Sequence, residues 1–310
     1  MINVAKKVDL RIQSTADLAN DWFALQKLKK DKPELFGLKS TGIRDLDKIL
    51  DGGVEAGQLV YIGGAPKSGK STLLKKIAMT YGKAQLNYLF VSGEMTNMQM
   101  GTLLYADEAS VNRSHIRAIK LSDLEWKRLE QAKEELAKTT GYWTYGLSNL
   151  ELLTAGIKEV EERSGKPLDA IFIDYIQLME AKTKGTRVQE IEFISRGLKR
   201  ISIQNEHPIA VYSASQLNRD SIRSKMVDPQ AFLGSGALER DMDIGMIVHT
   251  VEDPIAGKPY PNKRRITVVG SRETDIDSTD IYYNGTLARM GDEADESLIS
   301  LYDRYYGTNG

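Results

Sequence analysis

One motif restricts the fold of this chain more than any other feature. Residues 64–71 read GAPKSGKS and match the pattern G-x-x-x-x-G-K-[ST] in full. The residues before the motif, 58–62, are typical of a β-strand, and residues 71–81 are typical of a helix. In that context glycines let the loop wrap a phosphate with its backbone N–H groups pointing inward, and the helix N-terminus adds partial positive charge. A chance match in a glycine-rich turn is the alternative. We therefore expect a phosphate-binding loop in an α/β fold.

The motif assigns roles to its own residues. The ammonium group of Lys70 would reach the β- and γ-phosphates of a nucleotide, and the hydroxyl of Ser71 would bind Mg²⁺. The expected cofactors are therefore ATP and Mg²⁺. The predicted nucleotide-binding residues are Gly64, Ala65, Pro66, Lys67, Ser68, Gly69, Lys70, Ser71 and Thr72.

Strands and helices alternate after residue 38. Residues 170–175 (AIFIDY) form a continuous apolar run, as expected for a parallel strand with helices on both faces. Such alternation favours a doubly wound, mostly parallel sheet with right-handed crossovers, and two late segments favour an antiparallel pair. Ser-x-x-Glu capping boxes are predicted at Ser122 and Ser148. The other predicted strands are 87–92, 208–213, 244–250, 265–270 and 280–284, and the other predicted helices are 97–105, 126–138, 152–163 and 188–205.

The chain divides by pattern into three parts. We expect an N-terminal helical arm or linker over residues 1–35, one large domain over 36–290 and a C-terminal tail over 291–310. In residues 16–30 apolar residues recur at helical spacing, which predicts one amphipathic helix. That helix either packs on its own domain or docks as an arm on a neighbouring subunit. Its apolar positions are Leu18, Trp22, Leu25 and Leu28.

Composition excludes several kinds of function. The 310 residues include 42 Lys and Arg against 43 Asp and Glu, so bulk positive charge does not drive nucleic-acid binding. The chain has no cysteine, which excludes disulfides, cysteine-bound metals and thiol nucleophiles. Three scattered histidines do not form a metal motif. The absence of a signal segment or a long apolar run predicts a cytoplasmic protein with no membrane contact.

Three polar residues follow predicted strands and are candidates to act beside the loop. Asp174 ends the apolar strand and would hold magnesium, directly or through water. Glu94 follows the strand of residues 87–92 and would take a proton from an attacking water or orient it; a helix N-cap is its alternative role. Gln216 would hydrogen-bond a γ-phosphate and the loop behind it, so that hydrolysis moves that loop. Its alternative is an ordinary surface amide.

These residues resemble a known family. The order and spacing of the motifs are similar to those of the RecA-like motor domain of DnaB-type hexameric replicative helicases, and more distantly to RadA- and KaiC-like ATPases. The resemblance covers residues 38–285 and implies the RecA-like P-loop NTPase fold. The motifs are TGIRDLD from Thr41, GGAPKSGKST from Gly63, LFVSGEM from Leu89, FIDYIQLM from Phe172, SQLNRD from Ser215 and GSGALERDMD from Gly234.

The resemblance implies a hexameric ring with ATP bound between subunits, each site receiving an arginine finger from the neighbour. The matching stretch places that finger at Arg272, although Gly270 stands where the family often has a lysine. A surface arginine paired with Glu273 or Asp275 is the alternative. Weaker finger candidates are Lys263, Arg264 and Arg265.

A ring motor grips single-stranded DNA with loops that face its channel, mainly through phosphates. One candidate loop follows Asp174, and a second runs from Arg219 to residue 236. In the second loop, Leu233-Gly234 replaces the family's polar Arg-Glu pair. We therefore expect contacts to DNA there to come from backbone N–H groups rather than from those two side chains. Solvated loops with ordinary surface charge are the alternative. The predicted DNA-binding residues are Lys182, Lys184, Arg187, Arg219, Arg223, Lys225, Ser235 and Gly236.

The leading hypothesis is an ATP-driven DNA helicase motor that moves 5′ to 3′ on single-stranded DNA during replication, the direction being what the resemblance implies. Its expected partners are single-stranded DNA, further copies of the chain in a hexamer, and a primase or loader protein. Two alternatives stay open at this point. One is a RadA-like DNA-dependent ATPase in recombination, and the other is a KaiC-like ATPase whose partner is a protein.

Overall fold

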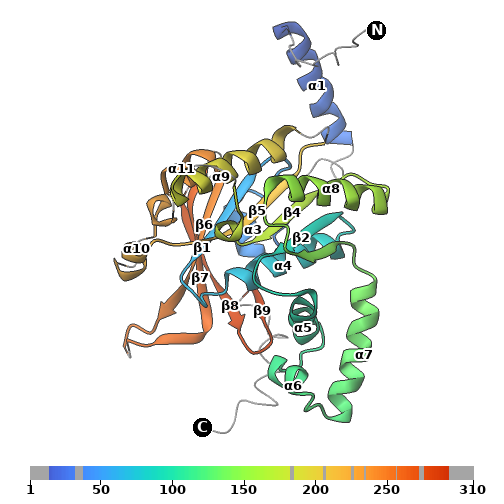
Figure 1. Ribbon diagram of the computed structural model, residues 1–310, viewed down its shortest axis with the longest axis vertical. Coiled ribbons are helices and arrows are strands. Elements are labelled where there is room, and N and C mark those ends of the chain that lie inside the picture. Colours follow the sequence, from blue (N-terminus) through green and yellow to red (C-terminus); the bar gives the residue numbers. More distant parts are fainter. Residues whose placement is uncertain are drawn as a thin grey trace. The chain divides into compact units, whose positions relative to one another are not determined.

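The computed structural model describes residues 14–31, 38–181, 185–204, 207–224, 227–233, 235–255, 257–271 and 276–292 (Figure 1). The chain separates into two units, Met1–Leu38 and Lys39–Gly310. The first unit contains helix α1 (Thr15–Asp31), which confirms the helix predicted over residues 16–30. Ser14 and Asp17 begin it with reciprocal side chain to backbone hydrogen bonds of 3.1 and 3.3 Å. Trp22 and Phe23 of α1 are both more than half exposed.

The second unit is built on one sheet of nine strands in the order β3-β2-β4-β5-β1-β6-β7-β8-β9. The first six strands in this order pair in parallel, and β7, β8 and β9 continue the sheet in antiparallel fashion. This confirms the predicted mostly parallel α/β sheet with late antiparallel strands. The strands are β1 (Leu59–Gly64), β2 (Tyr88–Ser92), β3 (Tyr142–Tyr145), β4 (Ala170–Asp174), β5 (Ala210–Gln216), β6 (Ile244–Glu252), β7 (Pro259–Ser271), β8 (Asp277–Asn284) and β9 (Arg289–Asp292).

Helices cover both faces of this sheet (Figure 1). Helices α3, α4 and α5 supply buried side chains to one apolar cluster, and α8, α9 and α11 supply the cluster on the opposite face. Such burial on both faces accounts for the uninterrupted apolar strands of the parallel part. The helices are α3 (Arg44–Ile49), α4 (Lys70–Lys83), α5 (Asn97–Glu108), α6 (Arg113–Ala118), α7 (Asp123–Ala137), α8 (Leu150–Ser164), α9 (Arg187–Gln204), α10 (Arg219–Ser224) and α11 (Ser235–Asp241), with short 3₁₀ turns η1 (Ile176–Leu178) and η2 (Pro229–Ala231).

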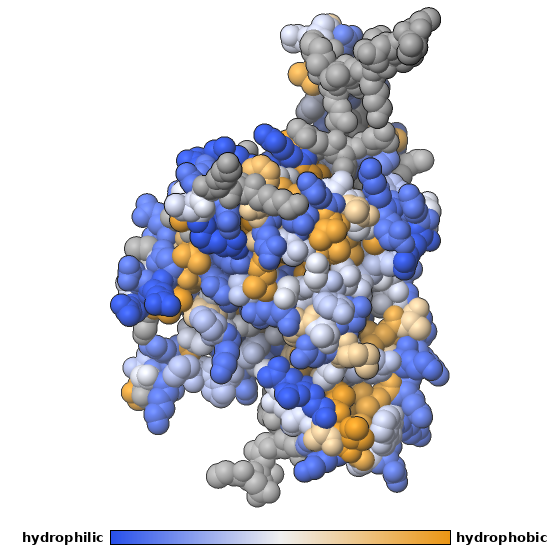
Figure 2. Space-filling model, viewed as in Figure 1, coloured by the Kyte–Doolittle hydropathy of each residue, from blue (hydrophilic) through white to orange (hydrophobic). Residues whose placement is uncertain are grey.

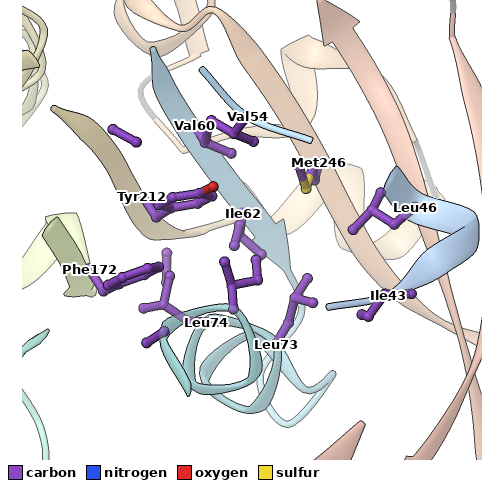
Figure 3. Close-up of a cluster of buried hydrophobic side chains, with 14 of the residues drawn as sticks. Ile43, Leu46, Val54, Val60, Ile62, Leu73, Leu74, Phe172, Tyr212 and Met246 are labelled. Carbon is purple, nitrogen blue, oxygen red and sulfur yellow. The ribbon is translucent and has the colours of Figure 1, made fainter. Parts of the chain in front are cut away.

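The core behind the phosphate-loop motif is fully buried. Figure 3 shows Val60 and Ile62 of β1 among Leu73 and Leu74 of α4, all without exposed surface. Four aromatic rings also stack across neighbouring strands on this face, with successive ring centroids 4.3, 6.2 and 4.9 Å apart. We call this set the aromatic ladder. In order from β3 to β5 it consists of Trp143, Phe90, Phe172 and Tyr212.

Helices α5, α6 and α7 form a smaller apolar cluster of their own beside the sheet, around Val111, Leu129 and Ala132. Figure 2 shows a hydrophobic surface patch in this region, between α6 and α7 at the lower right. Helix α7 carries two exposed apolar side chains, Leu124 and Trp126. Among the described residues no helix is both long and apolar enough to cross a membrane.

Local capping was predicted correctly at one helix and wrongly at another. In α7, Ser122 and Glu125 form the predicted capping box. In α8 the predicted box at Ser148 is wrong, because Asn149 is the N-cap and its side chain accepts from Leu152 N at 2.9 Å. The carbonyl of Ser148 instead accepts a hydrogen bond from Glu180 N at 2.6 Å. The N-cap of this helix therefore lies one residue after the predicted one.

Candidate nucleotide-binding site

The register of the sheet brings the candidate site residues to one edge. Gly64, at the end of β1, is aligned with Gln216 at the end of β5. Asp174, at the end of β4, is aligned with Ser92 of β2, and Gly93 N donates to Asp174 O at 2.7 Å. Carboxyl ends of parallel strands form the ligand-binding edge of such sheets. The structure therefore gathers residues that lie far apart in the sequence.

The loop between β1 and α4 has a backbone that requires glycine at two positions. A Cβ on Gly64 would lie 2.3 Å from Ser68 Oγ, which leaves no room for a side chain. Gly69 has a φ of 112°, and its Cβ would lie 2.6 Å from Met290 Cε. Both glycines of the motif are thus explained by close approach and backbone conformation.

Lys70 lies folded over this loop. Its Nζ donates to Gly64 O at 2.7 Å and to Ala65 O at 3.0 Å. Burial lowers the pKa of Lys70, while the carboxylates of Asp174 and Glu94 act in the opposite direction. The ammonium group is therefore held beside the loop by backbone oxygens and by the negative charge at the strand ends.

The Asp174 carboxyl group is almost completely buried, with 2% of the residue exposed. Burial raises its pKa to about 6, opposed by a hydrogen bond from Ser71 and by the charge of Lys70, while Glu94 raises it further. The carboxylate of Asp174 and the hydroxyl of Ser71 are both oxygen donors of the kind that Mg²⁺ prefers.

Two buried polar atoms at this edge are available to a bound ligand. Among the residues that the structure describes, Ser68 Oγ and Asp174 Oδ2 are the buried side-chain atoms without a hydrogen-bond partner. Buried polar groups are rarely left unpaired, and both atoms belong to the predicted nucleotide and metal site. Oxygen donors from a hydroxyl and a carboxylate, beside a lysine, fit a magnesium ion and a phosphate chain. The residues present therefore fit ATP and Mg²⁺.

Glu94 is exposed between β2 and α5. It does not cap α5, because Thr96 is the N-cap and forms a capping box with Gln99. The Glu94 carboxylate instead accepts a hydrogen bond from Tyr175, whose pKa is raised by burial and by this negative charge. Tyr175 was not predicted to belong to the site, although it directly follows Asp174 in the sequence.

Gln216 lies half-buried at the end of β5, and both its backbone groups are paired. Its N–H donates to Gln177 Oε1 at 3.1 Å, and its carbonyl accepts from Leu233 N at 2.9 Å. Gln177, in η1, also was not predicted to belong to the site. No local sequence pattern distinguishes the Gln177 amide from that of a surface glutamine. Its side-chain partners, Ser215 and Gln216, lie 38 and 39 residues further along the chain.

The candidate DNA-binding residues that the structure describes lie on three helices, α9, α10 and α11. Arg219 and Arg223 lie exposed on α10. Arg187 begins α9 and donates to the carbonyls of Gln177 and Met179 at 2.6 and 2.9 Å, so its guanidinium is engaged within the chain. Ser235 begins α11, and Gly236 follows it with open space where a Cβ would stand. Lys182, Lys184 and Lys225 lie outside the described residues.

The basic residues considered for the arginine finger differ in environment. Arg265 makes two hydrogen bonds to Asp280, at 2.5 and 2.9 Å, and Lys263 lies 3.6 Å from the same carboxylate. Arg264 is 8% exposed, donates to Ser68 O at 3.1 Å and lies over the ring of Tyr283. These contacts hold Arg264 against the loop of its own subunit. The main candidate, Arg272, lies outside the described residues.

Known proteins match this chain over most of its length. A family model described as the DnaB-like helicase C terminal domain matches residues 37–292. A probable replicative DNA helicase from Trieres chinensis is 30% identical over 76% of this chain and 52% of its own length. Replicative DNA helicase DnaB from Buchnera aphidicola subsp. Baizongia pistaciae (strain Bp) is 30% identical over 84% of this chain and 57% of its own length. The chain thus spans about half the length of these relatives.

Two solved structures share the fold. One is described as an ATPase domain, with a TM-score of 0.80 and 20% identity over 90% of this chain and 99% of the other. The second is described as a DnaB-like replicative helicase and its interactions with primase, with a TM-score of 0.75 and 20% identity over 87% of this chain and 67% of the other.

Proposed function

Because the chain belongs to the DnaB-like helicase C-terminal domain family, we propose that it is an ATP-hydrolysing motor that unwinds duplex DNA during replication. The observation that carries this proposal is the pair of unpartnered buried oxygens, Ser68 Oγ and Asp174 Oδ2, beside Lys70. That arrangement supports a magnesium-nucleotide site in a chain whose relatives are replicative helicases. RadA-like and KaiC-like functions are not favoured, because the matched relatives are DnaB-type proteins.

The loop residues would hold the phosphates of ATP. Backbone N–H groups of residues 64–71 and the ammonium group of Lys70 supply the positive field, and Ser71 with Asp174 would bind magnesium. Magnesium, when bound, neutralises charge on the phosphate oxygens. The low exposure of Asp174 keeps water away from this carboxylate and strengthens its electrostatic interactions.

Glu94 would act on the attacking water, as a base or as an orienting acceptor. It stands at the same sheet edge as Asp174, and its negative charge lies close enough to Tyr175 to raise the pKa of that hydroxyl. Gln216 would contact the γ-phosphate from the end of β5. Arg272 of a neighbouring subunit would stabilise charge on the transferred phosphoryl group.

This chemistry requires more than one copy of the chain, so the proposal includes a ring, with six subunits as the family resemblance implies. Helix α1 would form an arm, with its exposed Trp22 and Phe23 docking on a neighbouring subunit, and residues 36–290 would form the motor. The two candidate loops would hold single-stranded DNA, and the ring would move 5′ to 3′ along it, in the cytoplasm. The solved helicase whose description mentions primase supports a primase as a further partner.

Turnover of ATP with and without single-stranded DNA tests the proposal directly. We expect DNA to stimulate hydrolysis and a forked duplex to be separated when ATP is present. Lys70→Ala should abolish both activities, because the ammonium group is lost from the phosphate site. Lys133→Ala, which removes an exposed lysine from α7, is the matched control and should leave both unchanged. Turnover that persists in Lys70→Ala would contradict the site, and turnover that DNA leaves unstimulated in the unmodified chain would contradict the DNA motor.

A further inference from the structure

Gln177 occupies a junction between the nucleotide site and β5. It lies three residues after Asp174, in the turn η1 that leaves β4. Its side-chain amide donates from Nε2 to Ser215 Oγ at 2.9 Å and accepts at Oε1 from Gln216 N at 3.1 Å. A single amide therefore ties the exit of the strand that carries Asp174 to the end of the strand that carries Gln216.

The same residue holds the first candidate DNA loop. Gln177 O accepts from a guanidinium nitrogen of Arg187 at 2.6 Å, and that nitrogen also donates to Met179 O at 2.9 Å. Arg187 additionally pairs with Glu190 within α9. Because Gln177 precedes the loop and Arg187 ends it, this contact closes the base of the segment between η1 and α9.

The second candidate DNA loop is joined to the strand end that Gln177 contacts. Gln216 O accepts from Leu233 N, and Asn218 N donates to Ala231 O, both at 2.9 Å. Leu217 and Phe232 form a β-bridge between these two bonds. The segment that leads into α11 is therefore paired, residue by residue, with the end of β5.

We propose that Gln177 is a positioning residue that couples the γ-phosphate contact of Gln216 to both DNA loops. This inference rests on the proposed function of the chain. A shift of Gln216 toward a phosphate would move the Gln177 amide through the Gln216 N–H contact. The same shift would displace the Arg187 anchor on one side and residues 231–233 on the other. Coupling of this kind is reciprocal, so DNA held by the loops would in turn favour the hydrolytic position of Gln216.

Gln177→Leu tests the coupling, because leucine keeps most of the volume and removes both side-chain hydrogen bonds. The ratio of DNA-stimulated to DNA-free ATP turnover should fall by about tenfold. The affinity for a fluorescent ATP analogue should stay within about twofold, since the side-chain hydrogen bonds of Gln177 described above go to Ser215 and Gln216 rather than to the phosphate loop. Ser215→Ala removes the 2.9 Å bond and the 3.2 Å bond from Ser215 Oγ to Gln216 O but keeps the bond from Gln216 N to Gln177, so it should give a smaller fall of the ratio. Gln131→Leu makes the same change on the exposed face of α7 and should leave the ratio unchanged.

A rescue separates hydrogen bonding from simple packing. In Gln177→Glu the carboxylate can accept from Gln216 N and also from the Ser215 hydroxyl, so the ratio should recover above that of Gln177→Leu. A Glu variant no better than the Leu variant would contradict the assignment. So would a wild-type ratio in Gln177→Leu, or an equal loss of nucleotide affinity and DNA stimulation.

If Gln177→Leu does not fold, as judged by circular dichroism, Ser215→Ala decides the question by the same ratio. Unmodified protein that DNA does not stimulate would overturn the proposed function and the coupling together, whereas the other failures overturn only the coupling.

Discussion

At the scale of single residues, adjacent residues of β7 have different contacts because successive side chains of a strand point to opposite faces of the sheet. Arg264 contacts the phosphate loop through Ser68 O, whereas Arg265 is held by Asp280. In the sequence, residues 263–265 are simply a run of three basic residues. The residue types therefore predicted positive charge at these positions. The alternation of side chains along the strand determines that Arg264, and not Arg265, contacts the phosphate loop.

We expect Arg264→Met to weaken nucleotide binding. The substitution keeps apolar bulk but leaves the Ser68 carbonyl without its buried donor, at a cost of about 1–3 kcal/mol in folding free energy. Loss of loop order should lower the affinity for an ATP analogue about tenfold, measured by fluorescence titration. Arg265→Met is the matched control, and its affinity should stay close to that of the unmodified chain. Equal affinities in the two variants would argue against a supporting role for Arg264.

A second prediction concerns Glu94 and its partner. Glu94→Gln keeps the shape of the side chain but removes the base, so turnover should fall by about 10²–10⁴-fold with nucleotide affinity retained. Tyr175→Phe leaves the carboxylate in place and removes only its hydrogen bond, so its turnover should fall by a smaller factor. Steady-state hydrolysis and analogue binding measure the two effects. A Tyr175→Phe loss as large as that of Glu94→Gln would show that the tyrosine does more than orient the carboxylate.

At the scale of elements, a buried ionic network joins three of them. Lys75 of α4 is 2% exposed and pairs with Asp107 of α5, while its Nζ donates to Ala288 O at 2.7 Å. Arg289 of β9 pairs with the other oxygen of Asp107 at 2.6 Å and donates to Ser110 Oγ at 2.8 Å. The network fixes the helix after the phosphate loop against the helix after Glu94.

Removing the shared carboxylate should destabilise the fold strongly. Asp107→Asn leaves Lys75 buried and without its full counter-charge, at a cost of about 3–5 kcal/mol. The combined change Lys75→Met, Asp107→Leu and Arg289→Met should recover much of this loss, because no buried charge remains. Denaturant unfolding measures both free energies. A triple variant less stable than Asp107→Asn would contradict the balance of desolvation and pairing assumed here.

The same network sets a pH dependence. Burial acts to raise the pKa of Asp107, but Lys75 and Arg289 together hold it below its ordinary value. Its contribution to stability is therefore complete above the unfolded pKa of about 4 and is lost as the pH falls through the folded value. Asp107→Asn should accordingly lose less free energy of unfolding than the unmodified chain on acidification below about pH 4.

The sequence predicted those parts of the fold that depend on local patterns, and it did not predict contacts between segments that are distant in the sequence. The phosphate loop, the apolar strands and the α7 capping box are local patterns, and the structure has them where they were predicted. The four-residue edge strand β3 was not predicted, because its side chains are partly exposed and follow no clear alternation. The candidate site residues that the sequence singled out at strand ends lie at one edge of the sheet, and their roles stay predictions. The contacts of Arg264 and Gln177 were not predicted, since each joins segments that only the folded sheet brings together.

At the scale of the whole molecule, hydrolysis is predicted to need residues from two copies. In an oligomer mixed from Arg272→Ala and Glu94→Ala chains, an interface with both groups intact forms where the right neighbours meet, at about one interface in four for random mixing. Each variant alone should be inactive, and the mixture should regain turnover. Mixed oligomers of confirmed composition that stay inactive would argue against an arginine supplied by the neighbour.

The three tryptophans of the chain give this molecule a built-in set of optical reporters. Trp22 is 60% exposed on α1 and Trp126 is 49% exposed on α7, whereas Trp143 is stacked on Phe90 at the end of the aromatic ladder. Exposed indoles emit at longer wavelength than packed ones and respond to solution quenchers. Single-tryptophan chains would therefore let the N-terminal arm, the α5–α7 cluster and the central sheet be followed separately in one spectrometer, without any attached dye.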